Sequence, residues 1–174
     1  MKQRFLPVLL SALCLTFLFS SALRASDTQV DGIWYDFNDS EQTASVTYRG
    51  SYYDSYNKEY SGSVVIPETV NYHGKIYSVT SIGQFAFYGC SSLTSITIPN
   101  SITSIGYEAF RGCSSLPVID NIRYADTYLV EAVNKTLSTY TIKEGTKWIK
   151  YQAFYNCSSL TSVTIPNSVT SIGS

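Results

Sequence analysis

The chain is poor in the side chains that most catalytic and metal sites need. Its 174 residues include one histidine, His73, so any histidine-based catalytic triad would have to use it. His73 precedes Gly74 in a predicted turn, where a polar residue needs no catalytic role. The sequence has no CxxC pair or second histidine to complete a zinc site, and no glycine-rich phosphate-binding motif. We therefore predict no enzymatic activity, no catalytic residue, no metal and no cofactor.

Basic residues are also scarce beyond the first 25 positions. Residues 1–25 combine basic Lys2 and Arg4 with an apolar run and small residues before Ala22 and Ala25, which is typical of a secretory signal peptide cut after either alanine. Cleavage at the second site leaves nine basic side chains against thirteen acidic ones, a net charge of −4. That balance argues against nucleic acid as a partner. No later apolar run is long enough for a membrane span, so we expect a secreted or cell-surface protein.

Repetition is what the sequence has in abundance. Ala86–Ile102 and Ala153–Val169 are identical at 14 of 17 positions, and AFxxCSSL recurs at 109–116, which is 23 residues after the first copy. A fixed period of this length indicates a solenoid, in which each coil covers the apolar face of the next. We predict a β-rich leucine-rich repeat solenoid, right-handed, with 23-residue coils, parallel strands and short helical turns, one of them around Ala109-Phe110.

Each coil has an inner and an outer face. In Leu93–Ile98 alternation turns Ile96 and Ile98 inward and Ser95 and Thr97 outward. Equivalent residues should stack in columns, and two columns matter most. We expect phenylalanines in one continuous file and thiols buried as small hydrophobic groups. The members are Phe87, Phe110 and Phe154 in the first column, and Cys90, Cys113 and Cys157 in the second.

The residue types at two turn positions of the coil predict the backbone conformation there. The first holds Gly89, Gly112 and Asn156, residue types that tolerate positive φ, so we predict a left-handed residue there. The second holds glycine in other coils but Lys150 in one, which suggests that glycine is not sterically required at that position.

The region before the repeats reads as an N-terminal β cap at 27–78. It contains two predicted hairpins, and the stack should begin at Ser63–Val70, which imitates the repeat. The repeats occupy 79–174, with an irregular coil at 117–140 that we interpret as a third hairpin. The predicted strand pairs are Ile33–Phe37 with Ala44–Tyr48, Thr69–Tyr72 with Lys75–Val79, and Tyr128–Ala132 with Leu137–Ile142. Because no capping segment follows the last repeat before Ser174, we expect the front part of a longer protein.

Two surfaces are candidates for binding. The outward strand positions should align as a small, hydroxylated face, which is suited to many weak contacts rather than to a hot spot. They are Ser63 and Val65, Ser95 and Thr97, Val118 and Asp120, Thr139 and Thr141, and Ser162 and Thr164. The aromatic candidates are Tyr52, Tyr53 and Tyr56 in the cap, and Arg123, Tyr124 and Tyr128 in the irregular coil. The alternative for these tyrosines is that they pair across strands as ordinary β residues.

The phrase IGxxAFxxCSSLTSVTIPNSV around Cys90, Cys113 and Cys157 resembles the BspA-like leucine-rich repeat family of bacterial surface proteins. The resemblance covers about residues 63–174, and DGIWYDF and VTYRG near the start are also similar to that family. It implies a right-handed solenoid on the cell surface or secreted, with adhesion to host matrix proteins and other cells, and without catalytic residues in the repeats.

We therefore expect a recognition protein whose partner is a host extracellular matrix protein, another cell-surface protein or a glycan. The first alternative is a structural spacer that presents a C-terminal module and binds nothing itself. The second is an accessory region of a secreted hydrolase. Saturable binding distinguishes the recognition protein from the spacer.

Overall fold

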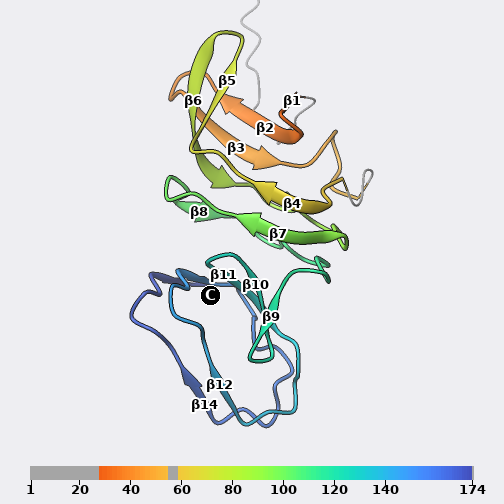
Figure 1. The fold of residues 1–174 in the computed structure, drawn as a ribbon, viewed down its shortest axis with the longest axis vertical. Helices are drawn as coiled ribbons and strands as arrows, with labels where there is room; N and C mark the ends of the chain where they lie inside the picture. Colours follow the sequence, from red (N-terminus) through yellow and green to blue (C-terminus); the bar gives the residue numbers. More distant parts are fainter. Residues whose placement is uncertain (1–27, 55–58, 174) are drawn as a thin grey trace, which may run out of the picture.

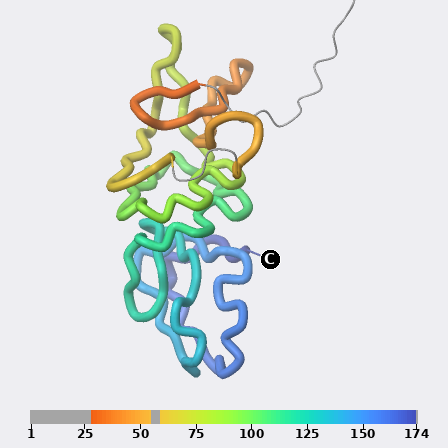
Figure 2. Tube along the Cα trace, turned by 90° about the vertical axis from the view of Figure 1, so that its right-hand side faces the viewer, coloured from red at the N-terminus to blue at the C-terminus, as the bar shows by residue number. Residues whose placement is uncertain are grey.

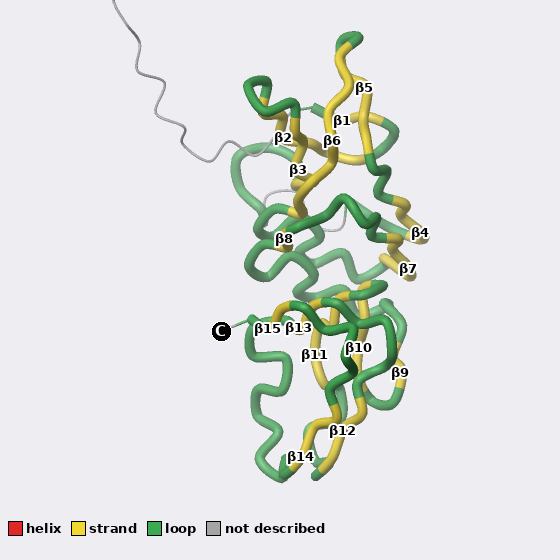
Figure 3. Tube along the Cα trace, turned by 90° about the vertical axis from the view of Figure 1, so that its left-hand side faces the viewer, coloured by secondary structure: helices red, strands yellow, loops and turns green. Residues whose placement is uncertain are grey.

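The computed structural model describes residues 28–54 and 59–173. The predicted signal peptide and Tyr56 lie outside these residues. Within them the chain forms strands and turns but no helix (Figure 3), so the short helical turns predicted for the coils are wrong, and Ala109-Phe110 lies in a plain turn. The strands are β1 (Gln29–Val30), β2 (Ile33–Asn38), β3 (Thr43–Thr47), β4 (Gly62–Val65), β5 (Thr69–Tyr72), β6 (Lys75–Ile82), β7 (Leu93–Thr97), β8 (Ser104–Ile105), β9 (Val118–Ile119), β10 (Ile122–Ala125), β11 (Tyr128–Ala132), β12 (Thr139–Thr141), β13 (Trp148–Ile149), β14 (Ser162–Thr164) and β15 (Ser171–Ile172).

The N-terminal sheet has the order β1-β2-β3-β6-β5, with β8 added on β6. The two hairpins predicted in this region are confirmed, β2 with β3 and β5 with β6. His73 and Gly74 join the second pair with φ of 50° and 77°, as a tight hairpin turn requires. Sequence reasoning missed β1, although Asp31-Gly32 before β2 is a strong hairpin signal.

The repeated strands pair in parallel, coil on coil. Strand β4 aligns Ser63 with Ser95 of β7, which confirms that the stack begins before the explicit repeat. Strand β12 aligns Thr139 with Ser162 of β14, 23 residues further on. Ile96 is buried and Thr97 exposed, so the predicted alternation holds.

Val118 and Asp120 do not join this alignment, because β9 pairs antiparallel with β10 instead. A two-residue turn at Asp120 and Asn121, with φ of 50° and 66°, makes the hairpin. Strand β10 then forms a second antiparallel pair, with β11. The predicted hairpin between Tyr128–Ala132 and Leu137–Ile142 is therefore wrong, since among the described residues β12 pairs with β14 and not with β11.

Strands β9, β10 and β11 form a partition, in which β10 and β11 are largely buried while both residues of the edge strand β9 are exposed. Along β11, Tyr128 and Val130 pack into one hydrophobic core, while Leu129 and Ala132 pack into another. A strand with both faces covered needs an almost continuous apolar run, which YLVEA supplies. We call residues 28–54 and 59–116 the upper stack, 117–132 the partition and 133–173 the lower stack.

Figures 1 and 2 show the upper and lower stacks one above the other, with the partition between them. Strands β4 and β7 run across the long axis of the molecule, whereas β12 and β14 are inclined along it (Figure 1). The irregular coil therefore changes the direction of the solenoid. The end of the chain returns to mid-height, because β15 pairs with β13, which pairs with β11 of the partition.

The partition also interrupts the predicted columns. Phe87 and Phe110 stack with ring centroids 5.1 Å apart, and the ring of Tyr128 follows Phe110 at 5.6 Å. Phe154 lies in the lower core against Tyr140, at 5.2 Å, so the single file of three phenylalanines is wrong at its third member. The physical reason is that the two-faced sheet stands where the next regular coil would stack.

The thiol column is interrupted at the same place. Cys90 and Cys113 are buried in the upper core, as predicted. Cys157 is half-buried and packs against the lower core, so the prediction fails for it. No disulfide joins these three cysteines.

The first turn position behaves as predicted, with φ of 70° at Gly89, 81° at Gly112 and 63° at Asn156. The second does not. A Cβ at Gly106 would lie 2.4 Å from the backbone nitrogen of Gln84, so glycine is required in that coil. Lys150 occupies this position in the coil that follows the partition, where its amide donates to the carbonyl of Leu129 in β11.

Candidate functional site

The junction of the upper and lower stacks is held by polar contacts between residues far apart in the sequence. The Asp126 carboxylate accepts a hydrogen bond of 2.8 Å from the amide of Ile98, at the end of β7. Lys147 donates to the side chain of Asn100 at 2.7 Å. These bonds attach the partition and the lower stack to turns of the upper stack.

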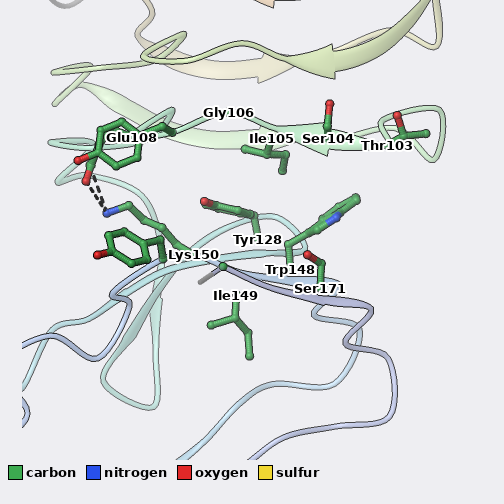
Figure 4. Close-up of a pocket in the computed structure, with 13 residues that line it drawn as sticks. Thr103, Ser104, Ile105, Gly106, Glu108, Tyr128, Trp148, Ile149, Lys150 and Ser171 are labelled. Atoms are coloured by element: carbon green, nitrogen blue, oxygen red, sulfur yellow. Dashed lines mark hydrogen bonds and ion pairs between the residues drawn. The ribbon is translucent and has the colours of Figure 1, made fainter.

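A cavity of about 320 Å³ lies at this junction. Figure 4 shows β8 with Ser104 and Ile105 on one side, and Tyr128, Trp148 and Lys150 on the other. In a regular solenoid the next coil would pair with β8, which here pairs with β6 only. The cavity is therefore a consequence of the irregular coil.

Glu108 and Lys150 form an ion pair at one end of this cavity (Figure 4). Both carboxylate oxygens of Glu108 lie 3.2 Å from Nζ of Lys150, and the side chains are only 10% and 16% exposed. Glu108 is held in the left-handed region at φ 52°, a conformation that Phe85 and Gln152 share at the equivalent turn positions of their coils. Breaking such a pair would leave a charge in poor contact with water.

A second hollow, of about 420 Å³, adjoins the cavity and shares Tyr107, Glu108 and Lys150 with it. We call it the junction groove. Its lining comes from one turn of each stack and from the end of the partition. The full lining is Tyr107, Glu108, Arg111, Glu131, Lys135, Lys150, Gln152, Tyr155 and Asn156.

The tyrosines of the predicted cap differ in exposure. Tyr52 is 70% exposed. Tyr53 is half-buried and stacks on Phe85 with ring centroids 4.0 Å apart, and it also contacts Tyr48 and Tyr88. Tyr53 thus shows the ring pairing that we considered as the alternative to binding, whereas Tyr52 faces water.

The binding residues predicted in the irregular coil make contacts within the fold instead of facing solvent. The Arg123 guanidinium donates to the carbonyls of Ser114 and Leu116 and pairs with Glu131 at 3.2 Å. Tyr124 is 1% exposed, and its hydroxyl accepts a hydrogen bond from the amide of Lys143. These two side chains fix the partition and do not face solvent as a binding surface would.

Tyr128 is buried too, at 6% exposure, although its ring borders the junction cavity. Burial, with the Glu108 carboxylate nearby, raises the pKa of its hydroxyl. Burial also raises the pKa of Tyr124. Both hydroxyls are therefore neutral at physiological pH.

The outward strand positions form two separate strips instead of one face. The upper strip lies on β4 and β7, where the Ser95 hydroxyl donates to that of Ser63 at 2.8 Å, and Thr97 is exposed. The lower strip lies on β12 and β14, where Thr141 is paired with Thr164. Asp120 is exposed in the turn of the partition, outside both strips.

Sequence reasoning missed the tyrosines of the turn face. Tyr107 is 52% exposed, Tyr151 40% and Tyr155 61%. Tyr107 and Tyr151 share one repeat position, and Tyr155 shares another with Arg111. The signal was available, because these are the solvent-facing positions at which the otherwise uniform coils differ.

Within residues 28–54 and 59–173 no group of three or more His, Cys, Asp or Glu side chains is arranged to hold a metal ion. The same part of the chain has no helix with the length and apolar character of a membrane span.

The comparisons with known proteins agree with the repeat fold. The model of the BspA type leucine-rich repeat region, in six copies, matches residues 80–174. A leucine-rich repeat protein from Bacteroides ovatus is 27% identical with a TM-score of 0.51, over 84% of this chain and 43% of that protein. One from Bacteroides capillosus is 27% identical with a TM-score of 0.49, over 83% and 86%.

A leucine-rich cell-surface protein from Faecalibacterium prausnitzii is 25% identical with a TM-score of 0.44, over 87% of this chain and 45% of that protein. The chain thus spans less than half the length of the B. ovatus and F. prausnitzii structures. No curated protein matches the chain. Since the repeat model covers more than half of its residues, the chain belongs to the BspA-type leucine-rich repeat family.

Proposed function

We propose that the chain is an extracellular or cell-surface recognition protein without enzymatic activity, which binds a host matrix protein, another cell-surface protein or a glycan and so supports adhesion. The signal-peptide-like start supports export. The right-handed arrangement of 23-residue coils and the role of residues 27–78 as their N-terminal cap belong to the same proposal.

The observation that carries the proposal is the junction groove with its exposed tyrosines. Tyrosine presents a rigid apolar ring and a polar hydroxyl, and is therefore enriched at binding hot spots. Tyr107 and Tyr155 are more than half exposed, although both belong to turns whose phenylalanines are packed in the cores. The two hydroxylated strips offer only small side chains, so they would add contacts around a partner rather than anchor it.

The test is binding of the purified chain to a coating of extracellular matrix and to an array of immobilised glycans. We expect saturable binding that the double substitution Tyr107→Ser with Tyr155→Ser reduces at least tenfold, because two anchoring rings are removed. The matched control is Ser95→Ala with Thr164→Ala, which changes one residue in each strip and should leave most of the binding.

A triple substitution of Tyr52, Tyr53 and Tyr56 by Ser tests the cap in the same assay. Loss of binding in that variant alone would move the site to the cap. Absence of saturable binding to either surface would instead favour the spacer.

A further inference from the structure

The junction groove has an excess of positive charge that its own residues do not neutralise. Five of its lining residues are charged. Glu108 is paired with Lys150, and Glu131 is paired with Arg123 just outside the groove. Arg111 and Lys135 remain, and among residues 28–54 and 59–173 neither has a hydrogen-bond or ion-pair partner for its side chain. Two cations thus face a groove in a chain whose formal net charge is −1.

The two cations are presented by different elements. Arg111 stands at the repeat position that Tyr155 occupies in a later coil, on an exposed turn of the upper stack. Lys135 follows β11 in a loop, where Asn134 accepts a hydrogen bond from the amide of Thr136 at 3.0 Å. A ligand that reaches both would contact the upper stack and the first loop of the lower stack at once, which makes the site specific to the irregular coil.

The rest of the lining supplies the other requirements of a sugar. Rings of Tyr107 and Tyr155 are exposed and can pack against the C–H face of a pyranose ring. Gln152 and Asn156 are exposed, and their side-chain amides carry the donors and acceptors that hydroxyl groups need, although the Gln152 amide nitrogen already donates to the Tyr151 hydroxyl at 3.1 Å. A volume of about 420 Å³ lies in the usual range for small-ligand sites.

We propose that the junction groove binds an anionic saccharide, with its sulfate or carboxylate group on Arg111 and Lys135 and its ring faces on Tyr107 and Tyr155. The inference rests on the proposed recognition function and names the ligand class of that site. A guanidinium and an ammonium group that line one groove suit either anion. An acidic peptide would satisfy the cations but would leave the tyrosine faces and the amides without a matching partner.

The experiment measures binding of the purified chain to three soluble probes by titration calorimetry. They are a sulfated heparin-type oligosaccharide, an oligogalacturonate and a neutral maltooligosaccharide. We expect binding of one or both anionic probes, at least tenfold weaker in Arg111→Ala and in Lys135→Ala because a charge-assisted contact is lost. The sulfated and carboxylated probes distinguish the two anions. Raising the salt concentration should weaken the binding.

Lys75→Ala is the matched control, because it also removes one positive charge but lies in the β5–β6 hairpin, paired with exposed Asp39. Equal loss in this variant would show non-specific attraction and overturn the proposal. The proposal is also overturned if the neutral maltooligosaccharide binds as tightly as the anionic probes. It is overturned as well if poly-glutamate binds more tightly than either anionic saccharide. If the chain binds matrix through Tyr107 and Tyr155 but none of the anionic probes, the ligand class is wrong and the recognition function stands.

Discussion

The two stacks share one nearly identical segment of 17 residues and bury it very differently. Ala86–Ile102 and Ala153–Val169 differ at three of 17 positions. Yet Phe87 is completely buried, whereas Phe154 is half-buried. Ile98 is 7% exposed, and its equivalent Ile165 is 47% exposed. The residue types are the same, so the difference does not come from composition.

The number of neighbouring coils explains the difference. The coil of Phe87 lies between the N-terminal sheet and the coil of Phe110. Among residues 28–54 and 59–173, β14 and β15 of the later coil each pair on one side, with β12 and β13. Strand β7 of the earlier coil also pairs on one side, with β4, but the partition covers its other side, where Asp126 accepts a hydrogen bond from the amide of Ile98. Because each coil of a solenoid covers the next, a coil covered on one side keeps its apolar residues partly exposed. The repeat thus encodes which residues face the core, and the neighbours decide how completely they are buried.

The matched substitutions Phe110→Ala and Phe154→Ala should give the largest difference in stability between the two stacks. Phe110 is completely buried between Phe87 and Tyr128, so we expect its loss to lower the free energy of unfolding by about 3–5 kcal/mol. Phe154 is only half-buried, and the same substitution should cost less than about half as much. Urea unfolding followed by circular dichroism measures both. Equal losses would show that burial does not separate the two coils.

The Glu108–Lys150 pair tests whether the two stacks unfold as one unit. Replacing Lys150 with Met leaves the Glu108 carboxylate nearly buried without its cation, which we expect to destabilise the chain by about 3 kcal/mol. Glu108→Gln should recover part of that loss in the double variant, because the uncompensated charge disappears. Lys75→Met, in an exposed pair, should have no measurable effect.

The fluorescence of each of the two tryptophans can report unfolding of a different stack. Trp34 in β2 packs on the upper core from within the upper stack, whereas Trp148 in β13 of the lower stack packs on the same core from across the junction. Their fluorescence can be isolated with Trp148→Phe and Trp34→Phe. We expect coincident urea transitions in the parent chain and separated ones after Lys150→Met. Transitions that stay coincident would mean that other contacts, such as that of Asp126 with Ile98, couple the stacks.

Elements whose local pattern is unambiguous could be predicted from the sequence. The inward and outward sides of β7 follow from alternation, and the β2–β3 and β5–β6 hairpins follow from turn residues. The pairing of β11 could not be predicted in this way. Its run YLVEA has no alternation, because its two faces meet different cores, and a run of this kind does not identify its neighbour.

The candidate site was harder to predict than the fold for a related reason. Tyr124 and Tyr128 are predicted as binding residues because they are aromatic residues in an irregular coil, but both are buried in the partition. Tyr107 and Tyr155 belong to regular coils, and they line one groove because the irregular coil brings their two turns together at the junction. The local sequence pattern predicts whether a side chain faces the core or the solvent within its coil. It does not give the place where two stacks meet.

The smallest expected effect concerns the thiols. Cys113 is buried, its Sγ donates to the carbonyl of Phe87 at 3.0 Å, and burial raises its pKa to about 12. Cys113→Ala should lower the free energy of unfolding by about 1–2 kcal/mol, and Cys157→Ala by less, because Cys157 is half-buried.

Thiol labelling sharpens this difference further, since the thiolate is the reactive form. At pH 8 Cys113 has almost no thiolate in the folded chain, and reagent reaches it only when the coil opens. Cys157 lies near the Tyr140 hydroxyl, 3.7 Å away, in the coil covered on one side. We expect mass spectrometry to show Cys157 labelled first, with Cys113 following at the rate of local unfolding. Equal rates at both positions would mean that the upper stack opens as readily as the lower, and that a neighbour on each side does not protect a coil.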